Sequence, residues 1–206
     1  MLFDATGAAP FSFHYADVGR VRLSATKTVA GATLAGSSNA FVVKPASLAI
    51  TSIRQTASPN TPNPGASAAG DAVFVRAGES FSATVTALGA TGVATPNFGR
   101  ETTPEGVQLS ATLVQPAGGA AGTLANATVS GGSFASGAAT ATQLHYSEVG
   151  IVTLAANLAS GSYLGAGAVS GPSTGNVGRF VPARSFGAIE NLPNWKNIAP
   201  RFGAAY

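Results

Sequence analysis

Apolar and polar residues alternate along several short stretches of the chain, and this period of two is typical of β-strands with one buried face. The alternation is most regular over Ser80–Leu88. Its apolar face consists of Phe81, Ala83, Val85 and Ala87. Residues 47–53, 72–76 and 106–114 are predicted as further strands, and segments rich in glycine, proline and polar residues separate them. Since no segment longer than ten residues shows helical periodicity, the pattern predicts an all-β fold.

A twelve-residue motif occurs twice in the chain. Residues 14–25 read HYADVGRVRLSA and residues 145–156 read HYSEVGIVTLAA, with seven of the aligned positions identical. After the glycine, both copies alternate as a half-buried strand does. The glycine eases a tight turn, and the acid before it, Asp17 or Glu148, can accept hydrogen bonds from nearby backbone N–H groups. Each copy therefore predicts a corner that leads into a strand.

A second apolar run ending at proline follows each copy, at residues 39–45 and 176–182. Corner, strand, loop and closing strand is the order in which an immunoglobulin-like sandwich ends. We therefore predict tandem immunoglobulin-like β-sandwich modules. Residues 1–44 would be the last strands of a truncated module, whose exposed edge needs a partner, and residues 46–182 a complete one. Residues 183–206 resemble neither copy and are interpreted as an irregular tail of different origin.

The composition narrows the functional classes. Only 9% of the residues are charged, and the net charge of +3 comes from cations that are spread along the chain. A nucleic-acid surface needs clustered cations and aromatic platforms, so we expect no nucleic-acid partner. The absence of cysteine excludes disulfides and thiolate metal sites. No apolar run approaches the roughly 18 residues of a membrane helix, so we expect no membrane-spanning segment.

Five short motifs, in their order along the chain, resemble the C-terminal region of MshQ-like proteins, which belong to the biogenesis cluster of the mannose-sensitive haemagglutinin pilus, a type IV pilus. These motifs are Ala77–Phe81, Thr95–Gly99, Glu148–Gly150, Tyr163–Gly165 and Val177–Pro182. The resemblance extends over roughly residues 10–182 and implies an exported Gram-negative protein that acts in pilus assembly or attachment. It brings no catalytic residue and no cofactor. It ends after Pro182, where Ala183 begins a sequence unlike the family's.

The tail resembles a segment of a TonB-dependent outer-membrane receptor. The residues that carry this resemblance are Pro193–Gly203, which read PNWKNIAPRFG. It implies either a fusion or a misassembled junction, with a divergent end of a pilus protein as the alternative. An outer-membrane receptor fragment is therefore a second hypothesis for the chain.

The two histidines of the motif, His14 and His145, raise the question of catalysis. A catalytic hypothesis would make them bases oriented by Asp17 and Glu148, with Ser147 as the nucleophile. A triad needs its groups and an oxyanion site to converge in space, and neighbours on one strand before a turn do not supply a pocket. We therefore favour a structural role at the corner and expect no enzymatic activity.

Two kinds of binding site stay open. A calcium ion at a module junction is one, although no run of carboxylates indicates its ligands. The other is a sugar-stacking surface formed by Phe98, Tyr163 and Trp195, for which core positions are the preferred alternative. We expect no cofactor and name no metal ligand.

Together these observations predict a non-catalytic structural or adhesive module of a pilus-associated bacterial surface protein. Its expected location is extracellular, as part of a longer exported chain. The expected partners are other domains of that chain or pilus components, and a surface glycan is an alternative. A carbohydrate-binding or glycan-processing β-sandwich is the third hypothesis; glycan processing would require two facing carboxylates roughly 5–10 Å apart.

Overall fold

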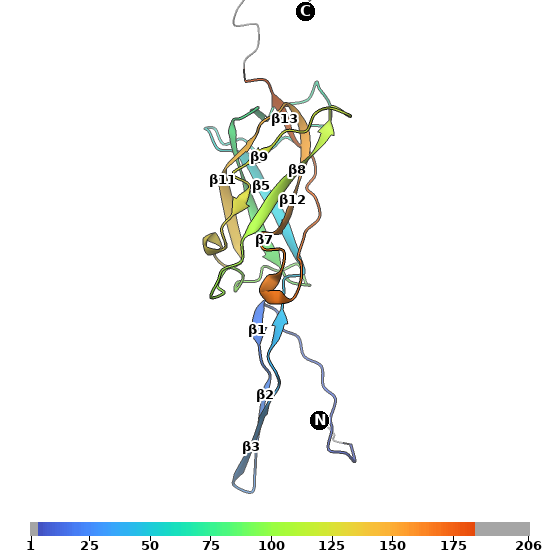
Figure 1. Ribbon diagram of the computed structural model, residues 1–206, viewed down its shortest axis with the longest axis vertical. Coiled ribbons are helices and arrows are strands. Elements are labelled where there is room, and N and C mark those ends of the chain that lie inside the picture. The colour runs from blue at the N-terminus through green and yellow to red at the C-terminus, as the bar shows by residue number, and fades with distance from the viewer. Residues whose placement is uncertain (1–3, 184–206) are drawn as a thin grey trace, which may run out of the picture.

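The computed structural model describes residues 4–183, and its regular secondary structure consists almost entirely of β-strands, which turns and loops connect (Figure 1). In chain order the strands are β1 (Gly19–Val21), β2 (Ser24–Val29), β3 (Ala32–Ser37), β4 (Phe41–Val43), β5 (Ser47–Gln55), β6 (Val75–Arg76), β7 (Ser80–Leu88), β8 (Val107–Gln115), β9 (Leu124–Ala125), β10 (Thr128–Val129), β11 (Ala138–Tyr146), β12 (Gly150–Leu158) and β13 (Val177–Val181). Two single 3-10 turns, η1 (Gly131–Ser133) and η2 (Tyr163–Gly165), lie in loops. The all-β prediction is confirmed.

Strands β5 to β13 form a sandwich of two sheets. One sheet has the order β5-β7-β11-β9, and the other has the order β10-β8-β12-β13-β6. These orders correspond to the ABED and CFG sheets of the immunoglobulin fold, with β12 and β13 as the last two strands, F and G. Strand β6 pairs in parallel with β13 at the edge of the second sheet. The predicted immunoglobulin-like end of the module is therefore present.

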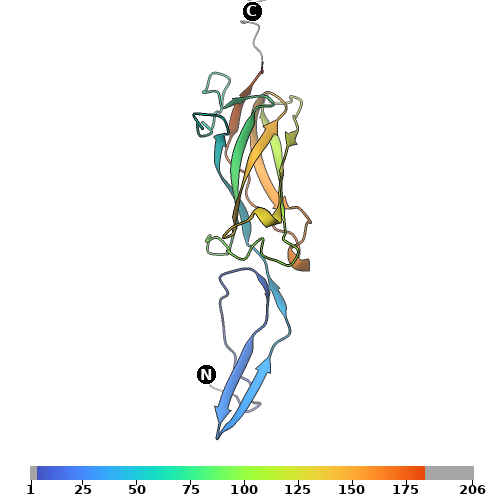
Figure 2. The same cartoon turned by 90° about the vertical axis from the view of Figure 1, so that its left-hand side faces the viewer.

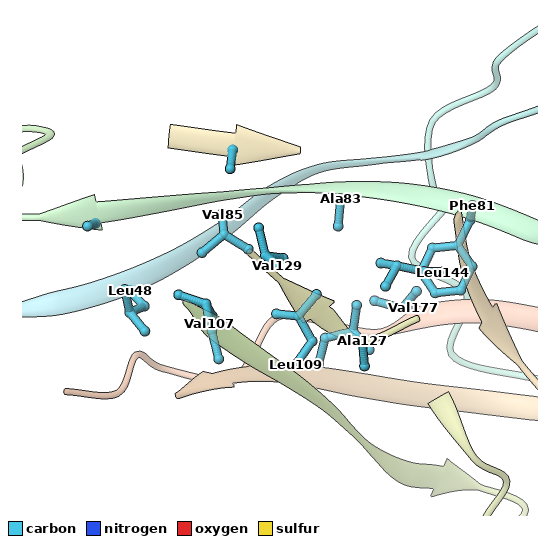
Figure 3. Packing of buried hydrophobic residues seen from close by; sticks show 14 of the residues in the cluster. Leu48, Phe81, Ala83, Val85, Val107, Leu109, Ala127, Val129, Leu144 and Val177 are labelled. Carbon is cyan, nitrogen blue, oxygen red and sulfur yellow. The ribbon is translucent and has the colours of Figure 1, made fainter. Parts of the chain in front are cut away.

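The core lies between the two sheets and is lined by the apolar face of β7 (Figure 3). All four residues of the predicted face, Phe81, Ala83, Val85 and Ala87, are fully buried. At one end of the core, the ring of Phe180 packs against Tyr146, Phe74 and Phe81, with centroid distances of 5.1 to 6.0 Å. Burial of such rings contributes much of the hydrophobic free energy that stabilises a small sandwich.

Strands β1 to β4 project from one end of the sandwich as a long antiparallel hairpin (Figure 2). β1 pairs with β4 next to the sandwich, and β2 pairs with β3 further out. Ala30 and Gly31 form the tip, with φ values of 51° and 84°. Two successive residues with positive φ make the kind of turn that suits a two-residue hairpin. All residues of β2 and β3 are exposed.

Three strands differ from the prediction. Strand β3 lies between the strand of the first motif copy and the closing strand at residues 39–45, where the predicted order has a loop. It forms because β2 supplies a pairing partner. Strand β11 was not predicted, because a register shift between Ala141 and Leu144 interrupts its alternation. Strand β6 is shorter than predicted, since only two residues pair with β13 while Val73 is exposed.

In residues 4–183 no helix has the length and apolar character needed to cross a membrane. Apart from Ala183, the predicted tail of residues 183–206 lies outside the described residues, and so does the receptor-like segment within it.

Candidate functional site

The two copies of the motif form the same backbone corner. Gly19 has φ of 135° and Gly150 has φ of 131°, a conformation that side chains disfavour. In each copy one carboxylate oxygen accepts a hydrogen bond of 2.8 Å from the N–H of the following residue: Oδ1 of Asp17 in the first and Oε1 of Glu148 in the second. The predicted roles of glycine and acid are confirmed, and the corner leads directly into β1 or β12.

In the second copy, the corner connects β11 in one sheet to β12 in the other. The side chain of Tyr146 is buried there, and its hydroxyl accepts a hydrogen bond of 2.8 Å from the N–H of Gly122. His145 lies with Nδ1 2.9 Å from the carbonyl oxygen of Gly78. His145 and Tyr146 therefore each contact a backbone atom of another segment, and Tyr146 also packs in the core, as expected for a structural corner.

The second copy does not assemble the catalytic arrangement that we weighed. The Ser147 hydroxyl accepts a hydrogen bond of 2.8 Å from the N–H of Thr123. The Glu148 carboxylate bonds the backbone of Val149, while His145 is bonded to Gly78. Each member of the hypothetical triad thus has a different backbone partner, and the three do not bond one another.

The first copy has an additional role, because it joins the hairpin to the sandwich. Oδ1 of Asp17 also accepts a hydrogen bond of 3.1 Å from the N–H of Asn97, in a loop of the sandwich. Val18 is buried and belongs to the sandwich core. On the other side of the hairpin, Nζ of Lys44 donates a hydrogen bond of 2.8 Å to the carbonyl oxygen of Ala168. We call these contacts the joint.

The Asp17 bond gives a direct test of the joint. In Asp17→Ala we expect the Asn97 amide to exchange about tenfold faster, since a hydrogen bond to a charged group contributes about 1.5 kcal/mol. Hydrogen–deuterium exchange followed by NMR measures this rate. Glu148→Ala is the control: it removes the acid of the other corner, whose bond is local, and should leave Asn97 unchanged. Equal effects of both variants on Asn97 would show that Asp17 does not hold the joint.

The loop beneath the joint is fixed by Glu101. Its carboxylate accepts hydrogen bonds from the N–H of Gly99, at 3.0 Å, and from the hydroxyl of Tyr163. Tyr163 stacks on Phe98 with ring centroids 5.8 Å apart, and both side chains are buried. The sugar-stacking hypothesis is therefore wrong for these two residues, and its third member, Trp195, lies outside the described residues.

Burial and the neighbouring carboxylate of Glu101 raise the pKa of Tyr163 far above its ordinary value. The unfolded chain would ionise this tyrosine near pH 10, so above that pH the folded state holds more protons and loses stability as the pH rises. In Tyr163→Phe we therefore expect a smaller fall in the free energy of unfolding between pH 9 and pH 11, measured by urea denaturation. An unchanged slope in Tyr163→Phe would contradict this.

An open polar cavity of about 560 Å³ lies between the first corner and the loops of the sandwich. Tyr15, Arg20 and Arg100 line it together with Glu101. Within residues 4–183 no group of three histidine, cysteine or carboxylate side chains is placed to hold a metal ion. The carboxylates of Asp17 and Glu101 accept hydrogen bonds from backbone and hydroxyl donors.

Three domain models of one family match the chain in succession. The model described as Domain of unknown function (DUF6701), first Ig-like domain, matches residues 1–37. The models for the second and the third DUF6701 domain match residues 44–145 and 148–192. The chain belongs to the DUF6701 family. No curated protein and no solved structure matches this DUF6701 chain.

The matches place the repeated motif within the DUF6701 organisation. The first match contains the first corner and strands β1 to β3. This part of the hairpin is therefore matched as part of an immunoglobulin-like domain. The boundary between the second and third matches falls between β11 and β12, so both contribute strands to one sandwich. None of these descriptions mentions a pilus or an outer-membrane receptor, and both resemblances therefore stay predictions.

Proposed function

We propose that this DUF6701 chain is a non-catalytic structural and adhesive module of a pilus-associated bacterial surface protein, exposed outside the cell. The observation that carries the proposal is the joint. The corner that begins the last hairpin of one immunoglobulin-like unit also docks that unit end-on to the next, through Asp17, Val18 and Lys44. A series of units joined in this way is suited to extend a binding surface away from the cell.

The chemistry of the described residues supports a structural role. The acidic side chains at the joint end of the sandwich each fix a loop: Glu105, for example, accepts hydrogen bonds from the N–H and the hydroxyl of Ser160, at 3.0 and 2.6 Å. Glu101 and Asp17 act in the same way on neighbouring loops. Carboxylates that accept these hydrogen bonds stabilise the conformation of the loops, whereas an acid–base catalyst needs access to a substrate proton.

The pilus assignment rests on the resemblance of residues 10–182 to MshQ-like proteins. The test is an in-frame deletion of the codons for these residues in the parent gene. We expect loss of surface attachment, of piliation, or of both, and restoration by the wild-type gene supplied in trans. Normal piliation together with normal attachment in the deletion strain would overturn the proposal.

Carbohydrate binding is a second candidate, favoured by the cavity at the joint. An exposed tyrosine ring, Tyr15, and two guanidinium groups, Arg20 and Arg100, line it. Aromatic rings and arginine forks are the groups that proteins use for planar and acidic ligands. Binding of the purified chain to a panel of immobilised glycans, lost in Arg100→Ala and kept in Arg22→Ala, would support it; no binding to any glycan would remove it.

A further inference from the structure

The repeated motif provides an internal comparison, since equivalent residues of the two copies are exposed to different extents. Leu144, the residue before the second copy, is fully buried, whereas Phe13, the residue before the first copy, is 52% exposed. Tyr146 is 1% exposed and its equivalent Tyr15 is 39% exposed. The same positions of one motif are therefore core positions in one copy and surface positions in the other.

The residues after the glycine show the same difference. In the second copy Val152, Leu154 and Ala156 all lie in the sandwich core. In the first copy the equivalent Leu23 is half-buried and Ala25 is exposed. Apolar residues repeated at inward-facing positions indicate a face that is built to be covered.

The structure shows what covers this face in the second copy. Strand β11 pairs with β7 and β9, and β12 pairs with β8 as well as with β13. In the first copy, residues 8–15 stand where β11 would be and belong to no sheet, while β2 pairs with β3 alone in the described part of the chain. Two strand edges of the first copy are thus open to pairing.

The first copy has an apolar cavity of about 640 Å³ between residues 8–15, which form one layer, and the β2–β3 hairpin, which forms the other. It is lined by Ala9 and Phe11 on one side and by Leu23, Ala25 and Gly36 on the hairpin. In the second copy the space between the equivalent layers is the packed core. The cavity therefore lies where a sandwich core would be, and the strands that would cover its open side are not among the described residues.

We propose that residues 8–43 form a strand-accepting surface, and that further β-strands of the same polypeptide, N-terminal to the described residues, cover it. These strands would pair with residues 8–15 and with the outer edge of β2, and their apolar side chains would fill the cavity. A backbone N–H from one of them would donate to the Tyr15 hydroxyl, as Gly122 does to Tyr146. This interaction surface is independent of any role in pili.

A covering layer from the same polypeptide agrees with two observations. In the sandwich, which is the second unit, strands β5, β7 and β8 cover β11 and β12. These three strands come from the part of the chain that precedes β11. The first unit is also matched as an immunoglobulin-like domain, a fold with two sheets. A second copy of this chain is a poorer occupant. Its strands β5 to β13 are already paired within their own sandwich, and its first unit would offer only the same hairpin and the same open edges, with no covering layer.

The test compares the chain with a longer protein that also contains the residues encoded directly upstream in its gene. The extension has the length of residues 47–137, the part of the sandwich that precedes β11. We expect the amides of β2 and β3 to exchange at least about 100-fold more slowly in the longer protein, which stays a monomer by light scattering. In the longer protein Leu23→Ser should restore fast exchange, whereas Arg22→Ser, at the neighbouring exposed position, should not.

Three results would overturn the proposal. The first is unchanged exchange of β2 and β3 in the longer protein. The second is slow exchange in the unextended chain that depends on its concentration, because a second copy would then be the occupant. The third is a parent gene whose reading frame contains no residues upstream of Met1.

Discussion

Gly150→Ala is expected to lower the free energy of unfolding of the sandwich by about 3 kcal/mol or more. A Cβ at this position would lie 2.2 Å from the carbonyl oxygen of Gln115, a backbone atom in the paired strand β8. The φ of 131° adds strain for any L-residue. Urea denaturation followed by circular dichroism measures the loss.

The first copy supplies the control for this substitution. Gly19 has nearly the same φ, but a Cβ there would meet no atom within 4 Å. Gly19→Ala should therefore strain the backbone by about 1–2 kcal/mol at the joint, and leave the main unfolding transition of the sandwich within about 0.5 kcal/mol of wild type. Equal destabilisation of the sandwich by both variants would show that the steric contact with Gln115 is not the cause.

Phe180→Ala is expected to destabilise the sandwich by about 3–5 kcal/mol. The Phe180 ring is buried and packs against three other aromatic rings, so truncation leaves a cavity that the two sheets cannot close. Phe11→Ala is the control, since it makes the same chemical change at an exposed ring. It should change the free energy of unfolding by less than about 0.5 kcal/mol. A loss below 1 kcal/mol in Phe180→Ala would contradict the core as described.

The sequence was most informative where local pattern and burial coincide. Strand β7 keeps strict alternation, and its boundaries, Ser80 and Leu88, agree with the prediction. The corner was also predictable, because a glycine with positive φ and an acid that bonds the next N–H are local features. Strand β11 was missed because its bulge and its small residues conceal the period of two.

The joint could not be predicted from local pattern. Asp17 meets Asn97 and Lys44 meets Ala168 across long sequence separations, and neither contact leaves a periodic signal. The different surroundings of Tyr15 and Tyr146 were equally hidden, because the two copies of the motif are alike in sequence. What distinguishes the copies is the set of strands that packs over each one, and this is a property of the fold.

The joint also explains why both copies contain the same corner although only one lies within a complete sandwich. An end-on contact needs a turn of defined geometry, and the corner provides one whose acid remains able to accept a second hydrogen bond. In the first copy Asp17 makes that second bond to Asn97. A corner of this kind can therefore close one unit and attach it to the next.

The distance between the hairpin and the sandwich tests the central claim most directly, namely that the joint holds the hairpin in a fixed position on the sandwich. The chain has no cysteine, so spin labels attached through Arg22→Cys and Ser110→Cys would report on these two sites alone. Pulsed electron paramagnetic resonance should give one narrow distance distribution, which broadens when Asp17→Ala is added. A broad distribution in the chain with intact Asp17 would contradict a fixed position of the hairpin.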